Sequence, residues 1–131
     1  MSQENVELYR RAAEAVTDGD LDGFLALMDA DVEAAPRLAP MEGGYHGHDG
    51  MRRWWESMHD AFPDFRVEVV EVRDLGDVTL AEVRGRGRGA ASDTPVEQRS
   101  WHVVEWRDRK FVRWRAYETQ SEALEAVGLS E

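Results

Sequence analysis

The sequence predicts an α+β fold in which helices come first and an antiparallel sheet follows. In the first half of the 131-residue chain, apolar residues recur at the three- to four-residue spacing of amphipathic helices. In the second half, valine-rich and aromatic segments alternate with turn residues, a pattern typical of strands. An apolar content of 42% is sufficient for one core, so we expect a single domain spanning residues 1–131.

Three helices and one strand are expected before residue 65. Residues 6–16 form an amphipathic helix, and Asp20 can cap a short second helix whose apolar stripe continues to Met28. Residues 31–38 indicate a short strand, followed by a loop over residues 40–50. A wide apolar face then predicts a third helix over residues 51–62, which Pro63 terminates.

The remainder of the chain predicts a four-stranded meander over residues 66–119, with turns at 75–77, 85–95 and 108–109. We interpret the Gly85–Gly89 run as the solvated end of a strand that enters a loop, where the glycines permit a bend or bulge. A short helix over residues 121–127 closes the chain and stops at Gly128.

Composition excludes several classes of function. The net charge of −11 disfavours a nucleic acid as partner, since only the second half of the chain has a local cluster of arginines, and the lack of cysteine excludes disulfides and thiolate chemistry. No apolar run approaches the roughly 20 residues needed to span a bilayer, and no signal peptide is visible, so we expect a cytoplasmic protein without a membrane partner. No phosphate-binding loop is present, so we also expect no cofactor.

The segment over residues 45–49 contains side chains that can bind a divalent metal. His46 and His48 lie close together with Asp49 beside them, but the two histidines lack a third ligand at a fixed spacing, and we expect the acidic residues around them to be solvated. The alternative is that His48 or Asp49 caps the helix that follows. We therefore expect no metal site.

His102 is a candidate functional residue within the most apolar strand. Strand alternation places His102, Val104 and Trp106 on one face of the sheet. Two interpretations remain open at this point. The residue is either a hydrogen-bonded core histidine or an acid, base or donor in a pocket.

The segment over residues 19–28 resembles the second-helix signature of the nuclear transport factor 2-like superfamily, which includes ketosteroid isomerases. Residues 45–55, 78–106 and 107–129 resemble, in order, its SnoaL-like branch of polyketide cyclase-like bacterial proteins. The resemblance implies a cone-shaped roll of cystatin-like topology, with N-terminal helices on the concave face of a curved sheet. It also implies a pocket between helices and sheet, and a homodimer formed through the sheet.

The catalytic residues of these relatives are largely missing from this chain. Matched to ketosteroid isomerases, Ala12 occupies the position of the oxyanion tyrosine, and Ala34 or Ala35 that of the basic aspartate. The second aspartate falls on His102. Matched to SnoaL-like cyclases and limonene epoxide hydrolases, the essential aspartate of the last strand falls on Ala116.

The nearest carboxylate on the same strand face as Ala116 is Glu118, so His102 and Glu118 are the catalytic candidates if both face one cavity. A two-residue turn at 108–109 would pair His102 with Arg115, so the arrangement needs a bulge or a longer turn. The candidates for ligand binding are Tyr45, Trp54, Trp55, Glu82, Arg84, Trp106 and Trp114.

Two functions therefore remain open. The first is a pocket protein for an apolar small molecule, acting as a cofactor-free isomerase, cyclase or hydrolase through acid–base chemistry. The second is a non-catalytic ligand-binding or dimeric interaction domain, which the alanines at the acid–base positions favour. In either case we expect a homodimer, with Trp101, Val103 and Tyr117 covering the outer sheet face.

Overall fold

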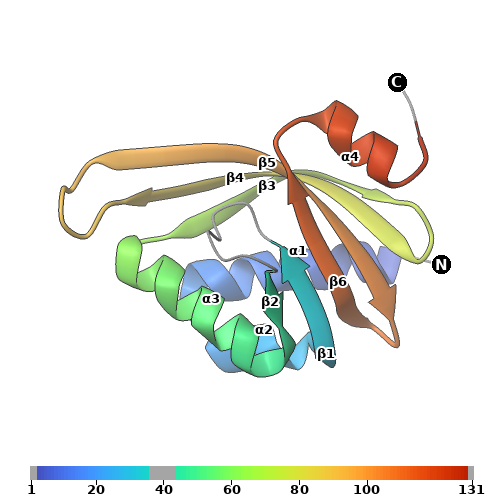
Figure 1. Ribbon diagram of the computed structural model, residues 1–131, viewed down its shortest axis with the longest axis horizontal. Coiled ribbons are helices and arrows are strands. Elements are labelled where there is room, and N and C mark those ends of the chain that lie inside the picture. Colours follow the sequence, from blue (N-terminus) through green and yellow to red (C-terminus); the bar gives the residue numbers. More distant parts are fainter. Residues whose placement is uncertain (1–2, 36–43, 130–131) are drawn as a thin grey trace.

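A curved, unclosed six-stranded sheet forms the body of the molecule in the computed structural model, which describes residues 3–35 and 44–129 (Figure 1). The strand order is β2-β1-β6-β5-β4-β3. Neighbours are antiparallel except for β1 and β6, which are parallel. The elements in chain order are α1 (Gln3–Asp18), α2 (Leu21–Ala26), β1 (Met28–Ala35), β2 (Tyr45–His46), α3 (Gly47–Ala61), β3 (Arg66–Asp74), β4 (Val78–Arg88), β5 (Pro95–Arg107), β6 (Lys110–Tyr117) and α4 (Gln120–Ala126).

The two N-terminal helices follow the predicted pattern with shifted ends. Helix α1 is longer than residues 6–16 at both ends. Asp20 caps α2 as expected, because its carboxylate accepts a hydrogen bond of 2.9 Å from the backbone N–H of Gly23. Met28 does not belong to that helix, since it begins β1.

The region between β1 and α3 differs from the expected strand and long loop. The strand begins at Met28 rather than residue 31, and residues 36–38 of the expected strand and 40–43 of the expected loop lie outside the described residues. Tyr45 and His46 form β2, and α3 starts at Gly47 instead of Met51. Gly47 has φ +71°, a conformation that favours glycine and lets the chain turn from β2 directly into the helix.

The meander of β3 to β6 is confirmed, but the expected loop over residues 85–95 is wrong at its start. Strand β4 continues to Arg88, and its register with β5 runs unbroken from Val78 to Arg88. The glycines of this strand produce no bulge in its pairing with β5. A Cβ atom on Gly87 would lie 2.9 Å from the Cβ of Phe62, so the missing side chain lets the segment after α3 pack against the strand.

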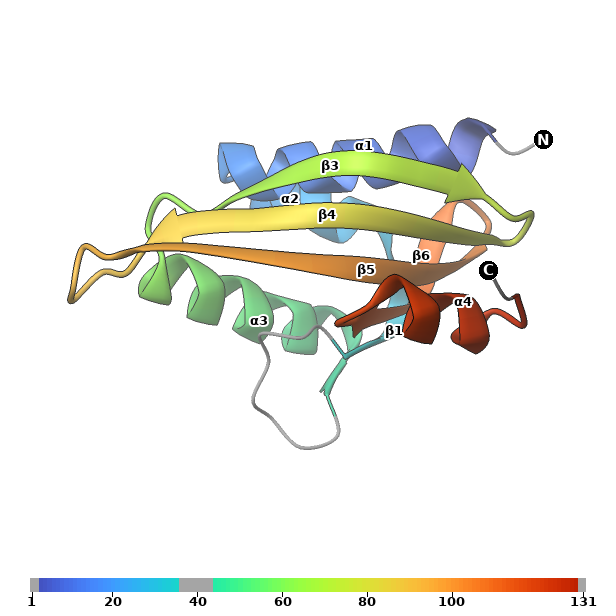
Figure 2. The same cartoon turned by 90° about the horizontal axis from the view of Figure 1, so that it is seen from above.

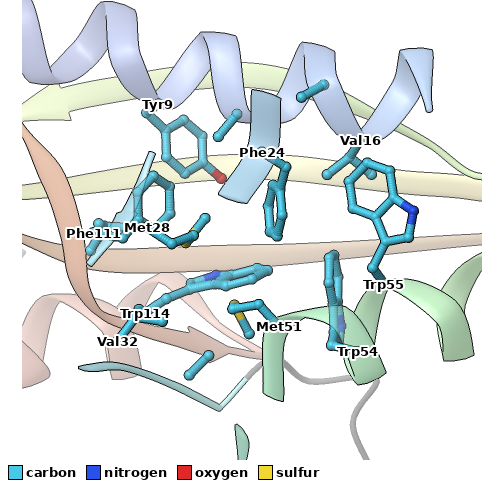
Figure 3. Packing of buried hydrophobic residues seen from close by; sticks show 14 of the residues in the cluster. Tyr9, Val16, Phe24, Met28, Val32, Met51, Trp54, Trp55, Phe111 and Trp114 are labelled. Atoms are coloured by element: carbon cyan, nitrogen blue, oxygen red, sulfur yellow. The ribbon is translucent and has the colours of Figure 1, made fainter. Parts of the chain in front are cut away.

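Helices cover both faces of the sheet unequally. Helices α1, α2 and α3 lie on the concave side and α4 on the convex side (Figure 1), and α1 and α3 run alongside the long strands (Figure 2). The concave side holds the main core, which is rich in aromatic side chains and includes Tyr9, Phe24, Met51, Trp54, Phe111 and Trp114 (Figure 3). None of the described helices is long and apolar enough to cross a membrane.

A smaller apolar cluster lies on the convex side beneath α4. Ala123 and Leu124 of this helix pack with Leu80 and Val103 of the sheet. Val103, expected on the outer face of the sheet, is therefore only 1% exposed. Trp101 and Tyr117 remain half-buried at the edge of this cluster.

Candidate functional site

A mainly apolar, partly open cavity lies on the concave side of the sheet, bordered by α1, α2, α3 and strands β3 to β6. The space open to the centre of a water-sized sphere is about 70 Å³. Since one such sphere needs roughly 10–15 Å³, this corresponds to a few water molecules. The lining residues are Tyr9, Ala12, Ala13, Val16, Phe24, Trp54, Met58, Phe65, Val67, Val83, Gly85, Gln98, Ser100, His102, Phe111 and Trp114.

One wall of this cavity is polar, and it belongs to a single strand. Gln98, Ser100 and His102 occupy alternate positions of β5, and the unbroken register with β4 keeps all three on one face. The same alternation places Val104 and Trp106 in the main core beyond them, as the sequence predicts. The strand therefore delivers a row of polar groups to an otherwise apolar space.

His102 lies between two hydroxyl groups. Its Nδ1 atom is 2.8 Å from the hydroxyl oxygen of Tyr9 on α1, and its Nε2 atom is 3.3 Å from the hydroxyl oxygen of Ser100. Together these three side chains form a continuous hydrogen-bonded series across the cavity, the Tyr9–His102–Ser100 chain.

The Tyr9–His102–Ser100 chain retains one polar hydrogen that neither of its two contacts uses, whichever tautomer the imidazole adopts. Two hydroxyls and a neutral imidazole carry three hydrogens, and the two contacts use only two of them. If Tyr9 donates to Nδ1, then Nε2–H donates to Ser100 and the Ser100 hydroxyl hydrogen is left over. In the other tautomer Ser100 donates to Nε2, Nδ1–H donates to Tyr9, and the Tyr9 hydroxyl hydrogen is left over. Both side chains line the cavity, so the chain can offer one hydroxyl donor to a bound molecule.

The three side chains of the Tyr9–His102–Ser100 chain are uncharged at neutral pH. Burial lowers the pKa of His102 from its ordinary value of 6.5 to about 4 and raises the pKa of Tyr9 above its ordinary value of 10.0, because the charged form of each group would lose its hydration. The lining residues of the cavity include no Asp, Glu, Lys or Arg. Nothing in the wall therefore compensates a charge on His102.

The register of β5 and β6 brings alanine, not a carboxylate, beside His102. The turn between these strands has two residues, Asp108 and Arg109, both with positive φ, and a register shift follows at Glu105 and Trp106. The two-residue turn and the bulge occur together, so His102 pairs with Ala116 and not with Arg115.

Glu118 is not brought to the cavity with His102. It follows the last residue of β6, its side chain is exposed, and its backbone N–H donates to the carboxylate of Glu122 at the start of α4. It is absent from the lining residues. In this structure the titratable partner of His102 is Tyr9.

Among the predicted ligand-binding tryptophans, Trp54 and Trp114 line the cavity and the other two do not. The rings of Trp54 and Trp114 meet edge to face with centroids 5.0 Å apart. Their Nε1–H groups are buried and have no hydrogen-bond partner within the described part of the chain. Trp55 and Trp106 belong to the surrounding core, where Trp55 stacks on His59.

The remaining three candidates lie away from the cavity. Tyr45 is buried in β2 as part of the main core. Glu82 and Arg84 alternate with Val83, whose side chain faces the main core, so they point to the convex face. There the Glu82 carboxylate accepts a hydrogen bond of 2.6 Å from Arg99.

Sequence reasoning missed Tyr9, Ser100 and Gln98. Helical spacing assigns Tyr9 to the apolar stripe of the first helix, where an aromatic residue usually contributes packing. Its hydroxyl, which needs a partner when buried, is the available signal. Ser100 and Gln98 could have been found by extending the alternation from His102 toward the start of the strand.

The residues considered for a metal make other contacts. His48 Nε2 is 2.9 Å from the carbonyl oxygen of Met28, and Asp49 accepts a hydrogen bond of 3.1 Å from Arg52. The expected cap is wrong, because the helix starts earlier and His46 occupies the N-cap position without a side-chain hydrogen bond. Within residues 3–35 and 44–129, no group of three His, Asp or Glu side chains is placed to hold a metal ion.

The sequence matches the SnoaL-like domain over residues 9–114. The chain belongs to the SnoaL-like domain family. This confirms the family resemblance seen in the sequence, and the matched residues include the whole cavity wall from Tyr9 to Trp114. No curated protein matches the sequence.

Solved structures of the same fold cover nearly the whole SnoaL-like chain. A nuclear transport factor 2-like protein of unknown function from Burkholderia pseudomallei K96243 is 20% identical with a TM-score of 0.78, over 98% of this chain and 99% of that one. A protein of ketosteroid isomerase-like fold from Catenulispora acidiphila DSM 44928, in complex with trimethylamine, is 18% identical with a TM-score of 0.77, over 94% and 93%. TerC, co-crystallized with polyporic acid, is 20% identical with a TM-score of 0.77, over 93% and 96%.

Proposed function

We propose that this SnoaL-like protein binds a neutral, mostly apolar small molecule that carries a hydrogen-bond acceptor. The observation that carries the proposal is the Tyr9–His102–Ser100 chain, which keeps one hydroxyl hydrogen without an acceptor inside an apolar cavity. A carbonyl, ether or hydroxyl oxygen of a ligand would accept that hydrogen. The aromatic and aliphatic wall would cover the rest of the molecule.

We infer that the ligand is uncharged from the side chains that line the cavity. Moving a charge into an apolar cavity is costly unless an opposite charge meets it. The lining contains no ionised side chain, and burial holds His102 in its uncharged form. An uncharged oxygen of a ligand needs only the hydrogen bond that the Tyr9–His102–Ser100 chain can donate.

The fold relatives support a small-molecule role of this kind. Of the similar structures, one protein is in complex with trimethylamine and another was co-crystallized with polyporic acid. At identities near 20% these proteins share the fold with this chain. The choice of ligand must therefore come from the residues of this cavity.

Catalysis is the second candidate function. The spare hydroxyl of the Tyr9–His102–Ser100 chain can donate a hydrogen bond to an oxygen on which negative charge develops, as isomerisation, cyclisation or hydrolysis would require. A pKa of about 4 makes His102 a weak proton acceptor at neutral pH. Proton transfer between His102 and Glu118 would further require Glu118 to leave its place beyond β6. Ligand binding is therefore the better-supported function.

A pair of matched probes tests the proposal. Cyclopentanone and methylenecyclopentane have nearly the same shape, but only the ketone has an oxygen acceptor. In calorimetric titrations we measure the affinity of the ketone relative to that of the alkene. We expect this ratio to be about 3- to 10-fold higher in the wild-type protein than in a Tyr9→Phe, Ser100→Ala, His102→Leu triple variant, because the triple variant removes every donor of the Tyr9–His102–Ser100 chain and one hydrogen bond is usually worth that much. An equal ratio of ketone to alkene affinity in the wild type and the variant would contradict the proposed role of the Tyr9–His102–Ser100 chain.

We also propose that the protein is a homodimer formed through the convex face. Val103 is covered by α4, so the available apolar side chains are Trp101 and Tyr117, which are neighbours across β5 and β6. Arg99 lies over the ring of Trp101 at 5.2 Å, and Arg115 over that of Tyr117 at 6.0 Å. Aromatic and arginine side chains are typical of interface centres.

A further inference from the structure

Gln98 provides a second polar position on the cavity wall, separate from the Tyr9–His102–Ser100 chain. It lies on the same face of β5 as Ser100, nearer the β4–β5 hairpin, and is half-buried. Its side-chain amide makes no hydrogen bond with another described residue. A primary amide has two donors and a carbonyl acceptor, so a bound molecule can use them without displacing another described side chain.

The residue opposite Gln98 has no side chain. Gly85 of β4 pairs directly with Gln98, and both line the cavity. A Cβ atom on Gly85 would lie 3.3 Å from the Phe65 ring, tighter than ordinary van der Waals contact. The glycine therefore leaves room for Phe65, which lines the cavity together with Gln98.

The two polar positions have a fixed spacing. Residues two apart on a strand are separated by about 6.6 Å, so a molecule along β5 meets Gln98 and Ser100 at that interval. Beyond Tyr9, the facing wall from α1 is apolar and consists of small and medium side chains, Ala12, Ala13 and Val16. A molecule that fits both walls has polar groups along one edge and an apolar body.

We propose that the ligand is a neutral molecule with two oxygen functions on an apolar ring-sized body, lying along β5. One oxygen contacts the Tyr9–His102–Ser100 chain and the other contacts the amide of Gln98. This inference rests on the proposed function and adds to it the substrate class and Gln98 as a specificity-determining residue. Met58, a flexible side chain in the wall, can move to admit a ring larger than the resting cavity.

The test uses two ketones that differ at one end only. Cyclohexane-1,4-dione has two carbonyl groups, and in 4-methylenecyclohexanone one of them is replaced by a methylene group of similar shape. We measure the ratio of their dissociation constants by calorimetry for the wild type and for Gln98→Met, which keeps the side-chain length without the amide. We expect Gln98→Met to reduce the preference for the dione by about 3- to 10-fold, as loss of one hydrogen bond predicts.

The control is Gln120→Met, the same change at a half-buried position on α4, outside the cavity. Its affinity ratio should equal that of the wild type. Gln98→Leu repeats the test with a differently shaped side chain, in case methionine itself fills the cavity. An unchanged ratio in both Gln98 variants, with both probes still bound, would overturn this inference and leave the proposed function standing. Failure of both ketones to bind the wild type would overturn both.

Discussion

At the scale of single residues, the surroundings of His102 determine its chemistry. Two hydroxyl groups contact its ring nitrogens, and alanines flank it on both neighbouring strands at positions 81 and 116. The sequence resemblance places the essential aspartate of SnoaL-like cyclases at the position of Ala116. In the structure Ala116 pairs with His102 across β5 and β6.

The lowered pKa of His102 predicts a loss of stability in acid. The unfolded chain protonates this residue below its ordinary pKa near 6.5, whereas the folded protein does so only near pH 4. Between these values the unfolded state binds more protons, so the free energy of unfolding falls as the pH falls. From pH 7 to pH 5 the stability advantage of the wild type over His102→Gln should shrink by about 2 kcal/mol.

Urea unfolding of both proteins at pH 7, 6 and 5 measures this difference. The other titrating groups are common to the two proteins, so their contributions cancel to first order. A constant difference between wild type and variant across that range would show that His102 is not held neutral by burial.

At the scale of the elements, much of the fold could be predicted because its signals are local. Helical periodicity, the Asp20 cap and the turn at 108–109 depend on residues that are neighbours in sequence. The parallel pairing of β1 with β6 depends on residues about 80 positions apart, and no local pattern encodes it. The bulge that places Ala116 beside His102 is likewise set by the tertiary structure.

The candidate site was predictable only in part for the same reason. Alternation placed His102, and the apolar face of the third helix contained Trp54. Tyr9 reaches His102 from a helix 93 positions away, so its role depends on how α1 crosses the sheet. Glu82 and Arg84 were misplaced relative to the cavity because residue type does not reveal which face of a strand is concave.

Two glycines, Gly87 near the end of β4 and Gly89 just after the strand, predict a contrast between two similar substitutions. Gly87→Ala brings a Cβ atom within 2.9 Å of the Phe62 Cβ, whereas Gly89→Ala meets mainly the Ser92 hydroxyl, which can rotate away. We expect Gly87→Ala to lower the free energy of unfolding by about 1–3 kcal/mol, the usual cost of overpacking, and Gly89→Ala to cost less. Thermal and urea melts of both variants measure this. Equal stability of the two variants would contradict the packing role assigned to Gly87.

At the scale of the whole molecule, the two faces of the sheet differ in what covers them. The concave face is covered by α1, α2 and α3 and contains the cavity, whereas α4 covers only part of the convex face (Figure 1). The proposed ligand site and the proposed dimer interface therefore lie on opposite faces of the sheet. A change on the convex face should therefore alter the oligomeric state and leave the cavity intact.

Trp101→Glu tests the proposed dimer. A carboxylate at this position would have to be buried at the centre of the proposed interface, at a cost that one side chain cannot offset. Light scattering at micromolar concentration should give a dimer mass for the wild type and a monomer mass for the variant. A monomer mass for the wild type would remove the proposal.

The central claim, that the cavity binds a neutral molecule with an oxygen acceptor, is tested most directly by nuclear magnetic resonance. The five tryptophan side chains lie at known places: Trp54 and Trp114 line the cavity, whereas Trp55, Trp101 and Trp106 do not. In a titration with cyclopentanone, we expect the indole N–H signals of Trp54 and Trp114 to shift most and to saturate together, with Trp101 on the convex face unchanged. Saturable shifts confined to Trp101, or no saturable shift at any indole, would contradict the account.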